Sequence, residues 1–238
     1  MRRIFIGDIQ GCSEALDRLL EAIDAAPADR LICVGDVVNR GPDSLGVLRR
    51  LADLDAEVVL GNHDLLLLEI ARGLRTVPPD SPLQPVLDAA DGTLLIDWLA
   101  HHPVVLTETD LVVVHAGLHP YWFDIMAIGR EINEAMADLT SCFADQRIKF
   151  ATRVRYCDAQ GHRPERDDPP PGEPFRPWDE FYNGERTVVF GHWARRGLVR
   201  QPRRRGLDTG CVYGGALTAW VAEEDRFVQV EGQKAVTS

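Results

Sequence analysis

The sequence has no CxxC pair and no apolar run near the length of about 18 residues that a bilayer-crossing helix needs. Its five cysteines are scattered and odd in number, which indicates free thiols in a reducing compartment. The start, MRRIFIGD, passes directly into a strand pattern, so no signal peptide is expected. These absences predict a cytoplasmic protein without a membrane partner.

Positive charge is also scarce. The chain has 26 Lys and Arg against 37 Asp and Glu, a formal net charge of −11. Such a balance argues against broad, non-specific nucleic-acid binding, although a local basic patch remains compatible with it. One such run lies between positions 195 and 205, with arginines at 195, 196, 200, 203, 204 and 205. Two interpretations stay open: a solvated hairpin, or arginines that reach a polyphosphate or an RNA 5' end.

The 238 residues show no internal repeat and are 45% hydrophobic, which is ordinary for a globular protein with a sizeable core. Apolar runs at 4–6, 31–34 and 58–60 each precede a helical pattern, at 13–23, 44–54 and 65–71. Continuously apolar strands are typical of a sheet covered on both faces. We therefore predict an α/β fold.

The second half of the chain is less regular. A loop is expected at 76–85 and an irregular lid or insertion at 163–177, which holds six prolines. The patterns predict helices at 92–99 and 124–139, and strands at 104–106, 111–114, 187–190, 206–209, 216–221 and 227–230. We treat residues 1–238 as one domain, with a lid-like elaboration at about 118–185.

Polar side chains follow five of the apolar runs, each beside a glycine: Asp8, Asp36, Asn62-His63, His115 and His192. Taken singly, a Gly-Asp is usually a turn and a lone histidine is usually structural. If the strands share one sheet, however, these side chains converge at its carboxyl edge. Carboxylate, amide and imidazole groups suit divalent manganese, iron, cobalt or zinc, and there are enough for two ions.

A pair of such ions can activate water and hold phosphoryl oxygens while charge develops on them. Arginines bind the remaining oxygens, and a histidine supplies a proton to the leaving group. The stretch GDVVNRGPDS fits this chemistry, because Asp36 and Arg40 lie four positions apart in one Gly/Pro turn. The residues therefore indicate a two-metal phosphoryl-transfer enzyme.

A family resemblance rests on the ordered motifs GDIQG (7–11), GDVVNRG (35–41), GNHD (61–64), HAG (115–117) and GH (191–192). They resemble the calcineurin-like metallophosphoesterases, in the phosphoprotein-phosphatase branch. GNHDLLLL (61–68), HAGLHPYW (115–122), TRVRYC (152–157), VFGHWA (189–194) and LDTGCVYGGALTA (207–219) more narrowly resemble the bacterial symmetrical bis(5'-nucleosyl)-tetraphosphatases. This resemblance implies a β-sandwich flanked by helices, with the active site at the carboxyl edge of the strands.

The resemblance also implies a set of metal ligands. Asp36 would bridge two ions, with the other ligands being Asp8 and Gln10 at the first ion and Asn62, His115 and His192 at the second. The family usually has His at position 10, and Gln10 is a harder, weaker ligand. It favours manganese, or else magnesium, over zinc; cobalt and iron are further candidates.

Catalytic and substrate roles follow from the same resemblance. His63, paired with Asp64, would protonate the leaving group, and Arg40 would bind the phosphate under attack. The groups expected to bind the rest of the substrate are Arg153 or Arg155 for phosphate and Trp122 and Tyr213 for a base. The two aromatic residues could equally be core or rim residues.

The expected reaction is hydrolysis of a dinucleoside polyphosphate, above all of diadenosine tetraphosphate to two ADP. Nucleoside-tetraphosphate caps on RNA are a second possible substrate. Asn39 stands where protein phosphatases have Asp, which favours a nucleotide substrate. The alternatives are a Ser/Thr-type phosphoprotein phosphatase, a broad metallophosphoesterase, and a non-catalytic nucleotide-sensing module that has lost its first metal.

Overall fold

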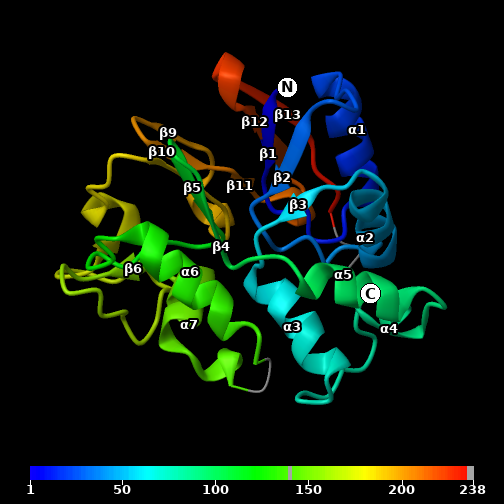
Figure 1. Ribbon diagram of the computed structural model, residues 1–238, viewed down its shortest axis with the longest axis horizontal. Coiled ribbons are helices and arrows are strands. Elements are labelled where there is room, and N and C mark those ends of the chain that lie inside the picture. Colours follow the sequence, from blue (N-terminus) through cyan, green and yellow to red (C-terminus); the bar gives the residue numbers. More distant parts are fainter. Residues whose placement is uncertain (139–140, 235–238) are drawn as a thin grey trace.

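The computed structural model describes residues 1–138 and 141–234. Within these ranges, no helix combines the length and the apolar composition required to cross a membrane. The strands form two large sheets and a small two-stranded sheet, and the helices lie around them (Figure 1).

The first sheet has the strand order β11-β12-β1-β2-β3, with β13 paired to β12. Strands β1, β2 and β3 are mutually parallel, so their carboxyl ends share one edge. The bounds of the strands are β1 (Arg3–Ile6), β2 (Arg30–Cys33), β3 (Glu57–Val58), β11 (Asp208–Thr209), β12 (Ala216–Val221) and β13 (Arg226–Glu231).

The second sheet has the order β4-β5-β8-β10-β9, and β5, β8 and β10 are parallel. Its strands are β4 (Val105–Thr107), β5 (Leu111–Val114), β8 (Thr187–Phe190), β9 (Val199–Gln201) and β10 (Arg204–Gly206). A separate hairpin-like pair joins β6 (Tyr156–Cys157) to β7 (Arg176–Pro177).

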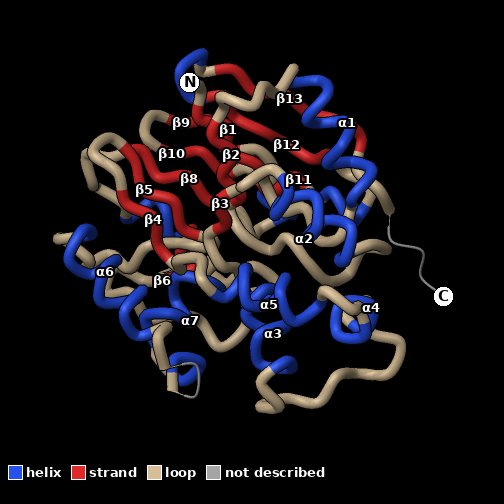
Figure 2. Tube along the Cα trace, turned by 45° about the vertical axis from the view of Figure 1, so that its right-hand side comes forward, coloured by secondary structure: helices blue, strands red, loops and turns tan. Residues whose placement is uncertain are grey.

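The two large sheets are joined by one apolar layer. Phe5 of β1 and Ile32 of β2 belong to the same buried cluster as Val113 of β5 and Val189 of β8. Because successive side chains of a strand point to opposite faces, the next residues along each strand turn outward. Those outward residues form a second core with the helices, as Figure 2 shows by the helices outside the strands. The prediction of sheets covered on both faces is confirmed.

Helices α1 and α6 cover different sheets. Helix α1 packs against β12 and β13, and α6 packs against β4. The bounds of the helices are α1 (Ser13–Ile23), α2 (Ser44–Asp53), α3 (Asn62–Ala71), α4 (Gln84–Asp88), α5 (Gly92–Ala100), α6 (Ile125–Ala135) and α7 (Gln146–Arg153). The predicted start of α2 is correct, since the Asp43 side chain accepts a hydrogen bond from the Gly46 N–H at 2.8 Å.

Several details differ from the sequence prediction. The predicted strand 206–209 is divided, because β10 ends at Gly206 in one sheet and β11 begins at Asp208 in the other. Helix α7 was not predicted, and α6 ends at Ala135 rather than at Leu139, which lies outside the described residues. The five apolar strands also do not share one sheet, so their ends meet across two.

Candidate metal centre and active site

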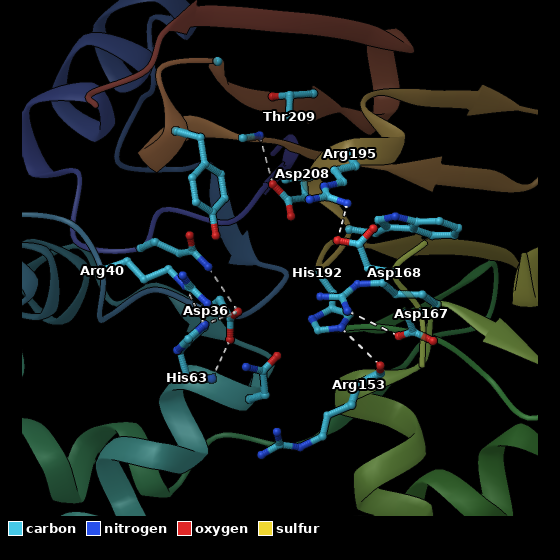
Figure 3. Close-up of a pocket in the computed structure, with 18 of the residues that line it drawn as sticks. Asp36, Arg40, His63, Arg153, Asp167, Asp168, His192, Arg195, Asp208 and Thr209 are labelled. Carbon is cyan, nitrogen blue, oxygen red and sulfur yellow. Dashed lines mark hydrogen bonds and ion pairs between the residues drawn. The ribbon is translucent and has the colours of Figure 1, made fainter. Parts of the chain in front are cut away.

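The carboxyl ends of the parallel strands of both sheets open into one cavity of about 1070 Å³ (Figure 3). Nine of the predicted site residues line it: Gln10, Asp36, Arg40, Asn62, His63, Arg153, Arg155, His192 and Tyr213. Asp8, Asp64 and His115 are buried directly behind them and contact them. Trp122 lies elsewhere. The structure therefore gathers nearly all of the predicted residues at one place.

Asp36 lies at the centre of this cavity, in a loop that Asp64 holds in shape. The Asp64 carboxylate accepts hydrogen bonds from the backbone N–H groups of Asp36 (2.7 Å), Val37 (2.9 Å) and Gly61 (2.8 Å). Asp36 has a left-handed φ of 52°. A Cβ atom on Gly61 would lie 2.3 Å from Asp36 Oδ1, so glycine is required for α3 to begin this close. Asp64 thus ties the loop after β2 to the start of α3.

The predicted pairing of Asp64 with the His63 side chain is absent. The Asp64 carboxylate is fully buried, and its hydrogen bonds go to backbone amides. Burial and the nearby charge of Asp36 raise the pKa of Asp64 to about 6, although the amides act in the opposite direction. Its role in the fold is to position Asp36 rather than to orient the histidine.

His115 is oriented as a metal ligand would be. Its Nδ1 atom lies 3.0 Å from the Val34 carbonyl oxygen, and its Nε2 atom lies 3.3 Å from Asp36 Oδ2. Metal-binding histidines commonly donate one ring N–H to a carbonyl and present the other nitrogen to the ion. Burial acts to lower the pKa of His115, but the Asp36 carboxylate outweighs it and raises that pKa. Either a proton or a cation can therefore bridge His115 and Asp36.

His192 and Asn62 present donor atoms to the same place. His192 Nε2 lies 3.2 Å from the Arg153 carbonyl oxygen, which leaves Nδ1 facing the site. One end of the Asn62 amide lies 2.9 Å from His192 Nδ1 and 3.1 Å from the Thr152 carbonyl oxygen. If the amide nitrogen occupies that end, it donates hydrogen bonds to His192 Nδ1 and to the Thr152 carbonyl oxygen. If the amide oxygen occupies it, Asn62 and His192 can bind one cation together. Burial and the charge of His115 lower the pKa of His192 well below its usual value, so the ring is neutral, as metal binding requires.

Asp36, His115 and His192 are close enough to hold one ion. One ligand atom from each lies within 4.8 Å of the other two. Carboxylate oxygen and imidazole nitrogen bind divalent metals at about 2.0–2.2 Å, so ligand atoms of one ion are separated by only a few ångströms. The three side chains come from both sheets, which shows why the sandwich is needed to build the site.

Buried negative charge marks the neighbouring position. Asp8 and Asp208 are 4% and 7% exposed, and neither forms an ion pair with any described residue. Burial and repulsion from Asp208 and Asp36 raise the pKa of Asp8 well above its usual value. Gln10 contacts the same group, since its Nε2 atom donates to Asp36 Oδ2 at 3.4 Å. Two divalent ions fit this set of donors, because they would neutralise carboxylates that otherwise repel one another.

His63 lies at the rim of this group, between Asn39 and Arg40. Asn39 Nδ2 is 2.7 Å from His63 Nδ1, and Arg40 Nε donates to His63 Nε2 at 3.0 Å. Asn39 and Arg40 both have left-handed backbones, with φ of 75° and 63°, which turns the two side chains toward the ring. Burial and the Arg40 charge lower the pKa of His63, against the effect of Asp36. The ring is therefore neutral at neutral pH.

Arginines form the outer part of the cavity. The Pro-rich segment carries Asp167 and Asp168 to them, so that Arg155 pairs with Asp167 at 3.3 Å and Arg195 pairs with Asp168 at 2.8 Å (Figure 3). The Arg153 side chain forms no ion pair with the described residues. Carboxylates and phosphates bind guanidinium in the same way. These arginines therefore present guanidinium groups to the cavity beside the candidate metal ligands.

Most of the arginine run at 195–205 is used in packing. Arg196 pairs with buried Asp179, Arg200 lies 4.4 Å from the centre of the Phe227 ring, and Arg205 pairs with Asp225 at 3.2 Å. Of the run, only Arg195 lines the cavity. The antiparallel strands β9 and β10 and the turn between them contain Arg200, Arg203, Arg204 and Arg205, so the hairpin interpretation fits these four but not Arg195 or Arg196.

The two predicted base-stacking residues are separated. Tyr213 is 56% exposed, lines the cavity and lies 5.8 Å from the Arg40 guanidinium. Trp122 instead lines a second hollow with His119 and Phe150. The structure therefore brings only Tyr213 to the metal centre.

The structure also adds residues that the sequence prediction missed: Arg75, Asp167, Asp168 and Asp208. Asp208 was detectable in principle, because it follows apolar Leu207 and lies two positions before a glycine. The strand before it is short, and the chain changes sheets at Leu207, so the strand-end pattern is weak there. Arg75, Asp167 and Asp168 come from loops, which show no periodicity.

Comparison with known proteins shows the family of the chain. A family model described as calcineurin-like phosphoesterase matches residues 1–196. A symmetrical bis(5'-nucleosyl)-tetraphosphatase of Janthinobacterium sp. (strain Marseille) is 39% identical, covering 95% of this chain and 94% of its own. One of the same name from Coxiella burnetii (strain RSA 493 / Nine Mile phase I) is 40% identical, covering 90% and 86%.

Solved structures show the same relationship. A crystal structure described as a candidate diadenosine tetraphosphatase has a TM-score of 0.77 at 33% identity, covering 98% of this chain and 94% of its own. A protein serine/threonine phosphatase from Saccharomyces cerevisiae has a TM-score of 0.54 at 14% identity, covering 100% and 81%, and shares the fold. The chain belongs to the calcineurin-like phosphoesterases, a family of metal-dependent hydrolases.

Proposed function

We propose that this protein hydrolyses dinucleoside polyphosphates, and diadenosine tetraphosphate symmetrically to two ADP. The observation that supports this most is the arginine lining of the metal-site cavity, formed by Arg40, Arg75, Arg153, Arg155 and Arg195. One guanidinium group can bind two phosphate oxygens at once. A chain of four phosphates therefore has enough oxygens to bind several arginines. The names of the relatives at 39% and 40% identity point to the same substrate class.

Two divalent ions would complete the site. We assign Asp8 and Gln10 to the first ion, Asn62, His115 and His192 to the second, and Asp36 to both. When bound, such ions supply an activated water and neutralise the charge on the phosphoryl oxygens. Manganese is the metal that we expect, because a set of two carboxylates, two amides and two imidazoles with no thiolate favours a hard ion over zinc.

The protein's own side chains position the substrate and move the proton. Arg40 binds the phosphate under attack, and its neighbour His63 donates a proton to the leaving oxygen. The leaving group would be ADP, whose phosphate oxygen is far less basic than a serine alkoxide and needs less help from an acid. Because its pKa is lowered, His63 takes up this proton only when an anionic phosphate offsets the Arg40 charge, and such a weakly protonated acid suits a leaving group that needs little help. The site therefore suits a phosphoanhydride better than a phosphoester.

Product analysis tests the reaction. Diadenosine tetraphosphate incubated with the protein and manganese in ¹⁸O-water should give ADP alone. Half of the ADP should carry the label, on its β-phosphate, because water attacks one of the two inner phosphorus atoms. Anion-exchange chromatography with mass spectrometry separates the products. ATP together with AMP would contradict symmetrical cleavage.

The alternative substrates can be separated by a competition panel. A phosphoprotein phosphatase would give a higher kcat/KM on phosphopeptides than on diadenosine tetraphosphate. The RNA alternative gains little from the arginine run, because Arg196, Arg200 and Arg205 are engaged in packing. A nucleotide-sensing module would bind about one ion per chain and show no turnover. We therefore retain the dinucleotide as the substrate.

Replacing Gln10 by histidine should shift the metal preference toward zinc and cobalt. Gln10 is 7% exposed and contacts Asp36, so an imidazole there would add a softer donor to the first site. Elemental analysis after dialysis against mixed metals measures the shift. The control is Gln201→His at an exposed position of β9. An unchanged metal profile in Gln10→His would mean that position 10 is not a ligand.

A further inference from the structure

A second hollow of about 390 Å³ lies outside the metal-site cavity. It combines aromatic side chains, His119, Trp122 and Phe150, with the basic side chains of Lys149 and Arg163. Its volume lies within the usual range for small-molecule pockets. Nothing in the catalytic assignments above uses this hollow, although Trp122 is one of the two residues expected from the sequence to stack on a base.

The aromatic wall offers faces to a flat ring. The centre of the His119 ring lies 6.0 Å from that of Trp122 and 4.9 Å from that of Phe150. Phe150 is buried, whereas Trp122 keeps part of its surface open to the hollow. Burial lowers the pKa of His119, so its ring is neutral and adds no charge to this wall. Aromatic side chains of this kind stack on nucleobases.

Two cations of the hollow have no carboxylate partner among the residues that the structure describes. Neither Lys149 nor Arg163 forms an ion pair with any described residue, whereas Arg147 on the same rim pairs with Asp145 at 2.7 Å. Partial burial and the charges of Arg153 and Arg155 lower the pKa of Arg163, with Asp167 opposing. Lys149 and Arg163 can therefore pair with an anionic ligand. Arg163 also lies near Arg153 and Arg155 of the metal-site cavity.

Helix α7 connects the two cavities. Gln146, Lys149, Phe150 and Arg153 are spaced at i, i+3, i+4 and i+7, so they lie along one side of the helix. The first three line the second hollow, and Arg153 lines the metal-site cavity. Four residues from Lys149 to Arg153 advance by about 6 Å along a helix. The hollow is therefore about one helical turn from the phosphate-binding arginines.

We propose that the second hollow binds one nucleobase of a dinucleoside polyphosphate, stacked on Trp122, while the phosphates pass Arg163 and Arg153 to the metals. This inference rests on the proposed function and assigns one end of the same substrate. From the hollow to the metal site, the protein presents first aromatic and then basic side chains. A ligand with a flat, uncharged base at one end, followed by anionic phosphates, matches this order. The other nucleoside would lie on the Tyr213 side.

Binding to the metal-free protein tests this assignment without turnover. The probes are a non-hydrolysable methylene-bridged analogue of diadenosine tetraphosphate and inorganic tripolyphosphate, titrated by calorimetry. Trp122→Ala should weaken the analogue about 10-fold, since stacking of a base on an aromatic ring contributes about 1–3 kcal/mol. Tripolyphosphate, which has no base, should bind Trp122→Ala and the unaltered protein equally.

Control variants make the result specific. Phe123→Ala removes the adjacent aromatic side chain, which is 85% exposed and lines neither cavity, and should leave both affinities unchanged. Trp122→Phe keeps a ring and should retain most of the affinity, which separates stacking from a folding defect. Lys149→Gln should weaken both probes, because it removes one of the two cations of the hollow that attract an anionic ligand. Normal affinity of Trp122→Ala for the analogue would overturn the proposal.

The outcome is independent of the proposed reaction. If the protein converts diadenosine tetraphosphate to ADP and Trp122→Ala binds the analogue normally, only the base-binding assignment fails. If the analogue binds through Trp122 but no ADP is formed, the proposed reaction fails and the base-binding site stands. A loss in Trp122→Ala confined to capped RNA, with normal binding of the dinucleotide analogue, would also overturn the assignment.

Discussion

Asp36→Asn should reduce turnover by about 10³-fold and remove most of the metal-dependent stabilisation of the protein. Asp36 is 1% exposed, and its carboxylate lies 3.3 Å from His115 Nε2 and 3.9 Å from His63 Nε2. Burial acts to raise its pKa, but the charges of His115 and His63 outweigh burial and hold that pKa below the usual range. Asp36 is therefore anionic at all working pH values and is the charge that both proposed ions share.

The substitution should spare the fold itself. Asparagine tolerates a left-handed backbone, so the φ of 52° is kept, and the backbone N–H of residue 36 can still donate to Asp64. Thermal unfolding with and without manganese measures the effect: the unaltered protein should gain stability from the metal, and Asp36→Asn should gain little. Asp55→Asn is the matched control, because Asp55 is exposed and also left-handed, with φ of 51°. Equal metal-dependent stabilisation in Asp36→Asn would remove Asp36 from the ligand set.

His63→Ala should lower turnover by about 10²–10⁴-fold while both ions remain bound, as expected for loss of a general acid. His63 Nε2 lies beside Arg40, whereas Asp36, His115 and His192 are the three side chains with ligand atoms close enough to hold an ion. His63 is therefore not assigned as a metal ligand, and its removal should leave the ions bound. Arg40 lowers the pKa of His63, and an anionic phosphate on Arg40 would offset that effect and favour the protonated ring. The substrate itself would thus help to place the proton.

Leaving-group dependence distinguishes a proton donor from a positioning residue. The loss in His63→Ala should be larger for phenyl phosphate than for p-nitrophenyl phosphate, since phenolate is the more basic leaving group and depends more on protonation. His162→Ala is the control, because its side chain is 76% exposed and lies outside the cavity. Elemental analysis checks that His63→Ala keeps its metal. Retained turnover, or the same loss on both aryl phosphates, would contradict the assigned role.

Much of the fold could be predicted from apolar periodicity. The strands around Ile6, Cys33 and Val114 and the helices α1, α2 and α5 occur where the sequence places them, within a few residues. These elements are strongly patterned and bounded by glycine, proline or a capping residue. Helix α7 was missed because it is short and is surrounded by irregular chain, although its last residue, Arg153, was selected by motif.

Side-chain partners could not be predicted in the same way. Asp64 follows His63 in the chain, yet at the start of α3 its carboxylate turns back to the amides of Asp36 and Val37. Trp122 is only seven residues beyond His115, but the chain leads it to another hollow. Neighbours in sequence point in different directions once a helix or turn forms, so spacing alone does not assign partners.

The sequence by itself determined which chemical groups this protein can offer. It placed carboxylate, amide and imidazole side chains directly after apolar strands, and those residue types at strand ends already indicated a divalent metal centre. Local physics is sufficient for this step, because a strand that is buried on both faces and ends at a glycine leaves the next polar side chain at the sheet edge.

Only the tertiary structure decided which of these groups meet. The site takes Asp8 and Asp36 from one sheet and His115 and His192 from the other, and the His192 N–H donates to Asp8 across 184 positions of the chain at 3.1 Å. The same packing gives Asp208 a place beside Asp8 and engages most of the arginine run elsewhere. Contacts of this range depend on how two sheets face each other, and that is set by the apolar layer between them rather than by any local motif.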